Sequence, residues 1–204
     1  MTLIEAQIKL KTLDYPILQT SDVSACLKIS RAHASKILGR LAAAGIMVKA
    51  ARGLWAFVDK TEPLMLPENL TAPLPSYVSL QTALYYHGMI SQIPEVIYAV
   101  SLARTRKYKT PLGVISLHHI VPEFFFDFQV IGEHAIKIAS PEKALLDILY
   151  LSPARSLLFQ SLPELELQSN FNIPKALQMV EKIPSKRTRT LVKNRLEKIL
   201  QKNK

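Results

Sequence analysis

The residues most able to do chemistry in this sequence are basic and hydroxyl-bearing side chains gathered in one short segment. They lie between positions 30 and 52, as Ser30, Arg31, His33, Ser35, Lys36, Arg40, Lys49 and Arg52. Lysine and arginine neutralise phosphates, and several of these residue types also form hydrogen bonds with the edges of bases. The set therefore indicates nucleic-acid binding, and its members between positions 31 and 36 are the candidates for base contacts.

The overall charge favours the same class of partner. The 204 residues include 26 Lys and Arg against 16 Asp and Glu, a formal net charge of +10. Residues 1–60 carry +5, residues 61–150 carry −2 and residues 151–204 carry +7. A positive field of this kind concentrates polyanions and speeds encounter with them. The C-terminal cations are equally well explained as solubilising side chains on exposed helix faces.

Two helical patterns precede the basic segment. The first places apolar residues on one side of a helix and stops at the Asp-Tyr-Pro turn of residues 14–16; these residues are Leu3, Ile4, Ile8 and Leu13. The second begins at Thr20 or Ser21, both good N-caps, and gives Val23, Cys26 and Leu27 a common face. The sequence thus predicts two helices before residue 28.

The basic segment itself is predicted to form a third helix and a hairpin. Ser30 caps the helix, and Gly45 supplies a left-handed C-cap. The buried stripe consists of Ala34, Ile37, Leu38 and Leu41, which leaves the basic residues outside. Residues 46–58 then read as a hairpin with Lys49 and Arg52 at its tip and Trp55 packed beneath it. We interpret residues 1–58 as a winged helix-turn-helix DNA-binding domain whose third helix enters the major groove, although such a basic face is also common on a merely solvated helix.

The rest of the chain is predicted to form a linker and a second domain, an α+β organisation overall. Residues 59–75 hold four prolines and no clear periodicity, so we expect a semi-extended linker. Residues 76–204 combine strand patterns with helical ones, which indicates a mixed α/β domain with a small sheet and a basic C-terminal helical segment. The strands are expected at 95–101, 113–121, 124–131 and 135–138, and the helices at 80–88, 141–151, 174–182 and 185–202.

A second basic cluster lies between two of the predicted strands. Its members are Arg104, Arg106, Lys107 and Lys109, with Tyr108 among them. A solvated turn is the plain interpretation. A phosphate or RNA contact with stacking on Tyr108 is the alternative.

The sequence offers little for catalysis. It contains no Gly-x-Gly-x-x-Gly, Walker, Gly-x-Ser-x-Gly or His-Glu-x-x-His motif, and no carboxylate has lysine two positions later, as restriction-type nucleases require. Cys26 is the single cysteine, and His118 and His119 would point to opposite faces of a strand. We therefore expect no enzyme, no cofactor and no metal site. Without an apolar stretch of ~18 residues we also expect no membrane contact and a cytoplasmic location.

Several dispersed motifs resemble the AbiEi antitoxin family. They are Tyr77-Val-Ser79-Leu80, Ala83-Leu84, Tyr86-His87-Gly88, Gln92-Ile93-Pro94, Arg104-x-Arg106 and Ala139-Ser140-Pro141-Glu142-Lys143-Ala144-Leu145-Leu146-Asp147. The resemblance implies a cytoplasmic autorepressor of an abortive-infection, type IV toxin-antitoxin pair. It would bind inverted repeats of double-stranded DNA in its own promoter, as a homodimer or as cooperative monomers, and counter a nucleotidyltransferase-like toxin without a stable complex.

The resemblance also implies roles for particular parts of the chain. It implies that DNA is contacted by seven residues: Arg31, His33, Ser35, Lys36 and Arg40 of the third helix, and Lys49 and Arg52 of the hairpin. It assigns the antitoxin function to residues 76–204 as a whole, and the second basic cluster is a candidate patch within them. Two alternatives stay open: a ligand-responsive winged-helix transcription factor whose α/β domain senses a small molecule, and an RNA-binding or RNA-modifying accessory protein.

Overall fold

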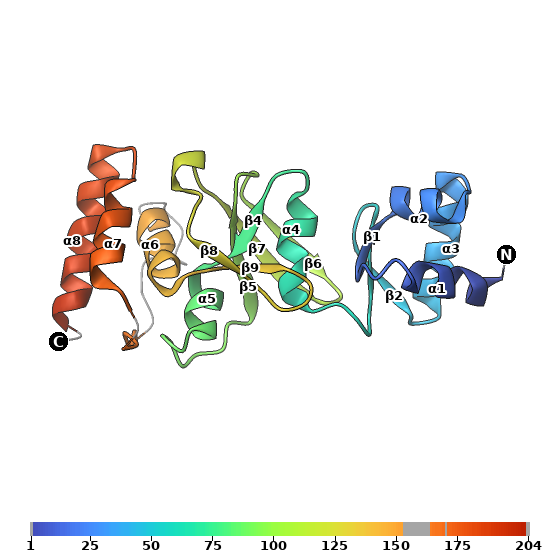
Figure 1. Cartoon of the computed structure of the whole chain (residues 1–204), viewed down its shortest axis with the longest axis horizontal. Coiled ribbons are helices and arrows are strands. Elements are labelled where there is room, and N and C mark those ends of the chain that lie inside the picture. The colour runs from blue at the N-terminus through green and yellow to red at the C-terminus, as the bar shows by residue number, and fades with distance from the viewer. Residues whose placement is uncertain (1, 153–163, 170, 203–204) are drawn as a thin grey trace.

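A computed structural model of the chain describes residues 2–152, 164–169 and 171–202. Helices and β-sheets both contribute, so the predicted mixture of α and β structure is confirmed. The N-terminal elements lie at one end of an elongated molecule, a large sheet occupies the middle, and the last two described helices lie at the other end (Figure 1). Among the described ranges, no helix is both long enough and apolar enough to span a membrane.

The N-terminal elements are three helices and a small antiparallel sheet. In chain order they are α1 (Leu3–Lys11), β1 (Ile17–Gln19), α2 (Thr20–Leu27), α3 (Arg31–Ala43), β2 (Met47–Ala51) and β3 (Leu54–Phe57). The strand order is β1-β3-β2, so β3 lies in the centre. Strand β1 is too short to show an alternating pattern, and the sequence did not predict it.

Most of the predicted N-terminal core is confirmed, with one error in the first helix. Ala34, Ile37, Leu38 and Leu41 of α3 are buried, as are Val23 and Leu27 of α2. In α1, however, Ala6 and Leu10 are fully buried, whereas Ile4 and Ile8 are 69% and 59% exposed. The burial stripe passes through the small Ala6, which a search for large apolar residues overlooks.

Residues 59–75 correct the prediction of a semi-extended linker. They form the 3-10 turn η1 (Pro63–Met65) and the helix α4 (Leu66–Thr71). Two of the prolines, Pro63 and Pro67, stand in the first turn of these elements, where the fixed proline φ angle suits a helix. Leu66 is fully buried, so this segment packs as part of the fold. The proposed domain boundaries themselves stay predictions.

A six-stranded mixed sheet forms the middle of the molecule, which corrects the prediction of a small sheet. Its strands are β4 (Ser76–Val78), β5 (Val96–Ser101), β6 (Arg106–Thr110), β7 (Gly113–His119), β8 (Phe128–Ile131) and β9 (Ile136–Ala139), in the order β6-β7-β5-β4-β9-β8. The pairs β5–β7 and β4–β9 are parallel, and the other pairs are antiparallel. Strand β6 corrects the prediction of a turn at 104–109. Its three cations, Arg106, Lys107 and Lys109, suit an edge strand, where charge discourages pairing with another chain.

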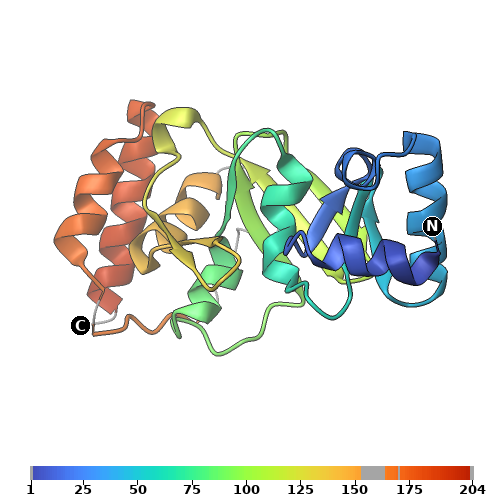
Figure 2. The ribbon, with the colours of Figure 1, turned by 45° about the vertical axis from the view of Figure 1, so that its right-hand side comes forward.

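Helices cover this sheet and extend the molecule away from the N-terminal elements. They are α5 (Leu80–Tyr86), α6 (Pro141–Leu151), α7 (Ile173–Glu181) and α8 (Lys186–Lys202), with the short turn η2 (Pro122–Phe124). Helix α6 contacts α5, α7 and α8, and Figure 2 shows α7 and α8 stacked beyond it. The predicted helices at 174–182 and 185–202 are thus confirmed within one residue.

The hairpin β2–β3 packs on both of its faces. Met47, Trp55 and Phe57 belong to the core beneath the three N-terminal helices. Ala50 and Leu54 belong instead to a small cluster with Leu66 of α4 and with Ile115 and Leu117 of the central sheet. This double contact fixes the hairpin between the N-terminal helices and the rest of the chain.

Candidate nucleic-acid interface

The predicted basic residues of α3 all lie on its exposed side. The hydroxyl of Ser30 accepts a hydrogen bond from the backbone N–H of His33 at 3.3 Å, which confirms Ser30 as the N-cap. Gly45 follows the helix with a φ of +71°, the left-handed conformation that ends helices and favours glycine. The exposed members of α3 are Arg31, His33, Ser35, Lys36 and Arg40. Capping and apolar spacing thus set which side chains face solvent.

Three of these side chains form a stripe along the helix. His33, Lys36 and Arg40 follow one another at intervals of three and four residues, the spacing of neighbours on one helical face. The ~10–12 Å diameter of an α-helix matches the ~12 Å width of the DNA major groove. A helix with this stripe on its exposed side therefore has the shape that a groove contact requires.

The cations of α3 and of the hairpin form no ion pairs in the described part of the chain. Within residues 2–152, 164–169 and 171–202, no ion pair involves Arg31, Lys36, Arg40, Lys49 or Arg52. By contrast, Lys11 pairs with Asp59 at 2.6 Å and Lys60 with Asp14 at 3.5 Å. The N-terminal elements therefore neutralise some cations internally and leave the α3 cations available for a polyanion.

Lys49 and Arg52 occupy different parts of the hairpin. The sequence predicts both at the tip, but only Arg52 lies in the turn, next to Gly53 with a φ of +77°. Lys49 lies within β2, opposite Trp55, and its ammonium is 5.7 Å from the centroid of that ring. Trp55 itself is buried and its Nε1–H donates to the Thr20 hydroxyl at 3.1 Å, which confirms the predicted packing role. A bulge at Ala50 separates the two cations.

The structure brings Arg31 and Arg52 to one hollow. This hollow, of about 390 Å³, lies where α2 begins, and its wall includes Thr20 and Ser21 as well as Asn69 and Leu70 of α4. The first turn of α2 carries the positive end of its dipole. The start of α3, the hairpin tip and α4 thus border a common, positively charged recess.

The second basic cluster is divided between two faces of the central sheet. Strand β6 places Arg106 opposite Leu117 and Lys107 opposite Ser116, and directly opposite residues share a face. Arg106 therefore lies on the side of the hairpin and α4, whereas Lys107 and Lys109 lie on the other side. The guanidinium of Arg106 is 4.8 Å from the centroid of Tyr108, so this ring is already covered by a side chain. All four cations, Arg104 included, are exposed.

A fully buried ionic cluster is the main feature that the sequence analysis missed. Lys143 forms an ion pair with Asp147, which also accepts hydrogen bonds from the hydroxyls of Tyr77 at 3.1 Å and Ser79 at 2.7 Å. Each of the four residues is at most 1% exposed. Burial lowers the pKa of Lys143 and raises the pKa of Asp147, and their mutual attraction opposes both shifts. The i, i+4 spacing of a lysine and an aspartate within an apolar helix was the available sequence signal.

Other candidates for chemistry have structural roles. His118 is 7% exposed and shares a hydrogen bond with the Ser116 hydroxyl at 3.0 Å, whereas His119 is exposed, as the strand geometry predicts. Burial lowers the pKa of His118 to about 4. Among the described residues, no three His, Cys, Asp or Glu side chains lie close enough together to hold a metal ion.

Comparison with known proteins adds no family assignment. No family model matches the chain, and no curated protein matches it. The resemblance to the AbiEi family therefore stays a prediction based on the motifs of the sequence.

Proposed function

We propose that this chain is a DNA-binding autorepressor and the antitoxin of a type IV toxin-antitoxin pair. Residues 1–58 would form a winged helix-turn-helix, with α3 as the recognition helix and β2–β3 as the wing. The partner would be double-stranded DNA with inverted repeats in its own promoter, bound by a homodimer or by cooperative monomers in the cytoplasm. The second part would counter a nucleotidyltransferase-like toxin without forming a stable complex with it.

One observation carries the DNA-binding proposal: the exposed stripe of His33, Lys36 and Arg40, whose cations have no carboxylate partner among the described residues. The helix that carries the stripe is capped, and its apolar face is buried, so the backbone beneath the stripe is ordered before DNA arrives. Binding then has to order only the side chains, which favours specific contact.

The test is a titration of the full chain against DNA from immediately upstream of its gene, with a shuffled duplex as control, over a series of salt concentrations. We expect tighter binding to the native sequence. The double variant Lys36→Ala/Arg40→Ala should bind more weakly, and its plot of log K against log salt should lose a slope of about 1.8, or ~0.9 for each phosphate contact.

A matched control separates this surface from net charge alone. Lys193→Ala/Lys198→Ala removes the same charge from exposed positions of α8, at the opposite end of the molecule (Figure 1). It should keep most of the affinity and the slope. Equal losses in both double variants, or equal binding of native and shuffled DNA, would overturn the assignment of α3.

The antitoxin activity rests on the sequence resemblance and has its own test. The product of the neighbouring gene would be expressed alone and together with this chain, and growth would be followed. We expect this chain to restore growth without co-purifying with the toxin. Restoration by the Lys36→Ala/Arg40→Ala variant would separate antitoxin activity from DNA binding.

A further inference from the structure

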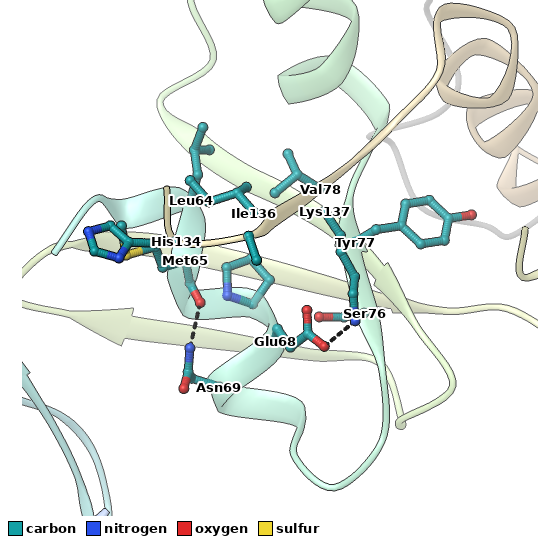
Figure 3. A pocket seen from close by; sticks show the side chains of 12 residues that line it. Leu64, Met65, Glu68, Asn69, Ser76, Tyr77, Val78, His134, Ile136 and Lys137 are labelled. Atoms are coloured by element: carbon teal, nitrogen blue, oxygen red, sulfur yellow. Dashed lines mark hydrogen bonds and ion pairs between the residues drawn. The ribbon is translucent and has the colours of Figure 1, made fainter. Parts of the chain in front are cut away.

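A second pocket lies on the α4 side of the central sheet, away from the basic stripe. Its volume is about 270 Å³, and its walls come from η1, α4, β4 and residues 134–137 (Figure 3). The proposed contacts with DNA do not use it. Its lining is apolar over much of its area, with Leu64, Met65, Val78 and Ile136 among its members.

One end of this pocket is polar and balanced in charge. The ammonium of Lys137 and the carboxylate of Glu68 are 2.5 Å apart and partly exposed (Figure 3). A phosphate at this end would meet the carboxylate, and a cationic ligand would meet the ammonium. The pair therefore favours an uncharged ligand that offers a hydrogen-bond donor to Glu68 and an acceptor to Lys137.

The hydroxyl of Ser76 lies at the same end and lacks a partner. Ser76 is fully buried, and its Oγ has no hydrogen-bond partner among the described residues. Strand alternation sends the neighbouring Tyr77 to the opposite face, where its hydroxyl donates to Asp147, so Ser76 faces α4 (Figure 3). Burial of an unpaired hydroxyl raises the free energy of the folded state. Buried polar groups in native structures usually have a hydrogen-bond partner, which can be a water or a ligand.

We propose that this pocket binds a small uncharged nucleobase or a related cyclic amide. Such a ring presents an N–H donor beside a C=O or ring-nitrogen acceptor, and these groups match Glu68, Lys137 and the Ser76 hydroxyl. Its flat apolar faces match the side chains of Leu64, Met65 and Ile136. Sites for drug-sized ligands occupy ~300–1,000 Å³, so 270 Å³ suits one or two rings without a sugar and phosphates.

The pocket also has a route to solvent. A neighbouring hollow of about 640 Å³ shares Met65, Asn69, His134 and Ala135 with it and extends to residues 14–17 and 59–60 beside β1. A ligand therefore enters the pocket without displacing a strand or a helix. The proposal does not depend on DNA binding.

The test uses the full chain and four probes: uracil, cytosine, adenine and 1,3-dimethyluracil. Binding is measured by calorimetry and by the shift of the melting temperature. We expect at least one of the three free bases to bind and to raise the melting temperature. Dimethyluracil has nearly the same ring but no N–H donor for Glu68, so it should not bind.

Two variants test the polar end. Ser76→Ala removes one hydrogen bond to that base, and Glu68→Gln replaces the carboxylate with an uncharged amide oxygen, which is a weaker acceptor. Each variant should weaken binding of the base about three- to tenfold. Ser76→Ala should leave the melting temperature of the free protein unchanged or higher, because it removes an unpaired hydroxyl. Ser116→Ala is the matched control: its hydroxyl is buried but bonded to His118 outside the pocket. It should lower the melting temperature and leave base binding unchanged.

Three results would overturn the proposal. The first is that none of the free bases binds at millimolar concentration. The second is that Ser76→Ala and Glu68→Gln bind the base as tightly as the wild-type protein, or that dimethyluracil binds equally well. The third is that Ser76→Ala destabilises the free protein as much as Ser116→Ala does, since the hydroxyl would then have a structural role.

Discussion

Replacing Lys143 with methionine tests whether the buried ionic cluster holds the second part of the molecule together. Lys143→Met keeps most of the side-chain length and removes the ammonium. Asp147 would then remain fully buried, with only the hydroxyls of Tyr77 and Ser79 as hydrogen-bond donors from side chains. The ammonium also lies 3.8 Å from the centroid of the Phe124 ring, a desolvated cation–π contact that the variant loses.

The expected loss of stability is large. Removing one partner of a buried ion pair costs about 3–5 kcal/mol, a large part of the ~5–15 kcal/mol that stabilises a typical domain. The loss should also depend on pH. Without Lys143, burial raises the pKa of Asp147 further above its value in the unfolded chain, so protonation favours the folded state. The variant should therefore recover stability as pH falls, by up to about 1.4 kcal/mol per pH unit while Asp147 is ionised only in the unfolded chain.

Urea unfolding followed by far-ultraviolet circular dichroism, between pH 5 and pH 8, measures this effect. The double variant Lys143→Met/Asp147→Asn supplies the control, because an asparagine oxygen still accepts from Tyr77 and Ser79 while no charge remains buried. It should regain most of the lost free energy. A loss below about 1 kcal/mol in the single variant, or a double variant no more stable than the single one, would refute the role given to the buried charge pair.

Two further predictions concern single side chains. The pKa of His118 is about 4 in the folded protein and ~6.5 when unfolded, so the unfolded chain takes up the proton first and stability falls as pH drops below 6.5. Between pH 7 and pH 5 the wild-type protein should lose about 2 kcal/mol more than His118→Gln in urea unfolding, and equal pH dependence of the two would contradict the assignment. Ser30→Ala removes the cap of α3 and should cost about 1 kcal/mol, whereas Ser30→Asp should retain the cap; a change below the error of the measurement would show that the hydrogen bond to His33 adds nothing.

Local sequence rules predicted the helix that carries the basic stripe. Ser30 and Gly45 mark its ends through cap chemistry that depends on neighbouring residues alone, and the apolar spacing from Ala34 to Leu41 specifies its buried side. The same rules located α7 and α8. Where neighbouring residues alone determine the ends and the buried side of a helix, the sequence was sufficient to predict that helix.

The rules failed where a distant partner determines the local structure. Residues 59–75 look like a linker because four prolines interrupt any pattern, but Leu66 is buried against the hairpin and the central sheet. The sequence of β6 resembles a basic turn because its cations obscure the alternation of polar and apolar residues that marks a strand. Its pairing with β7 stabilises the strand conformation. The hydrogen bonds of Asp147 with Tyr77 and Ser79, and the pocket that Ser76 shares with Lys137, likewise join elements that lie about 60 to 70 residues apart in the chain.

The hairpin β2–β3 packs on two parts of the molecule, and this double contact has a consequence for the proposed recognition of DNA. Its face with Met47 and Trp55 completes the N-terminal core, and its other face, with Ala50 and Leu54, packs on α4 and the central sheet. A hairpin held on both sides does not swing freely, so the position of Arg52 relative to α3 is set by both cores. Residues 1–58 alone would expose Ala50 and Leu54 and release that constraint. Measurements of DNA affinity therefore report on the proposed interface only when they use the full chain, and substitutions in α4 should affect DNA affinity through the hairpin without touching DNA.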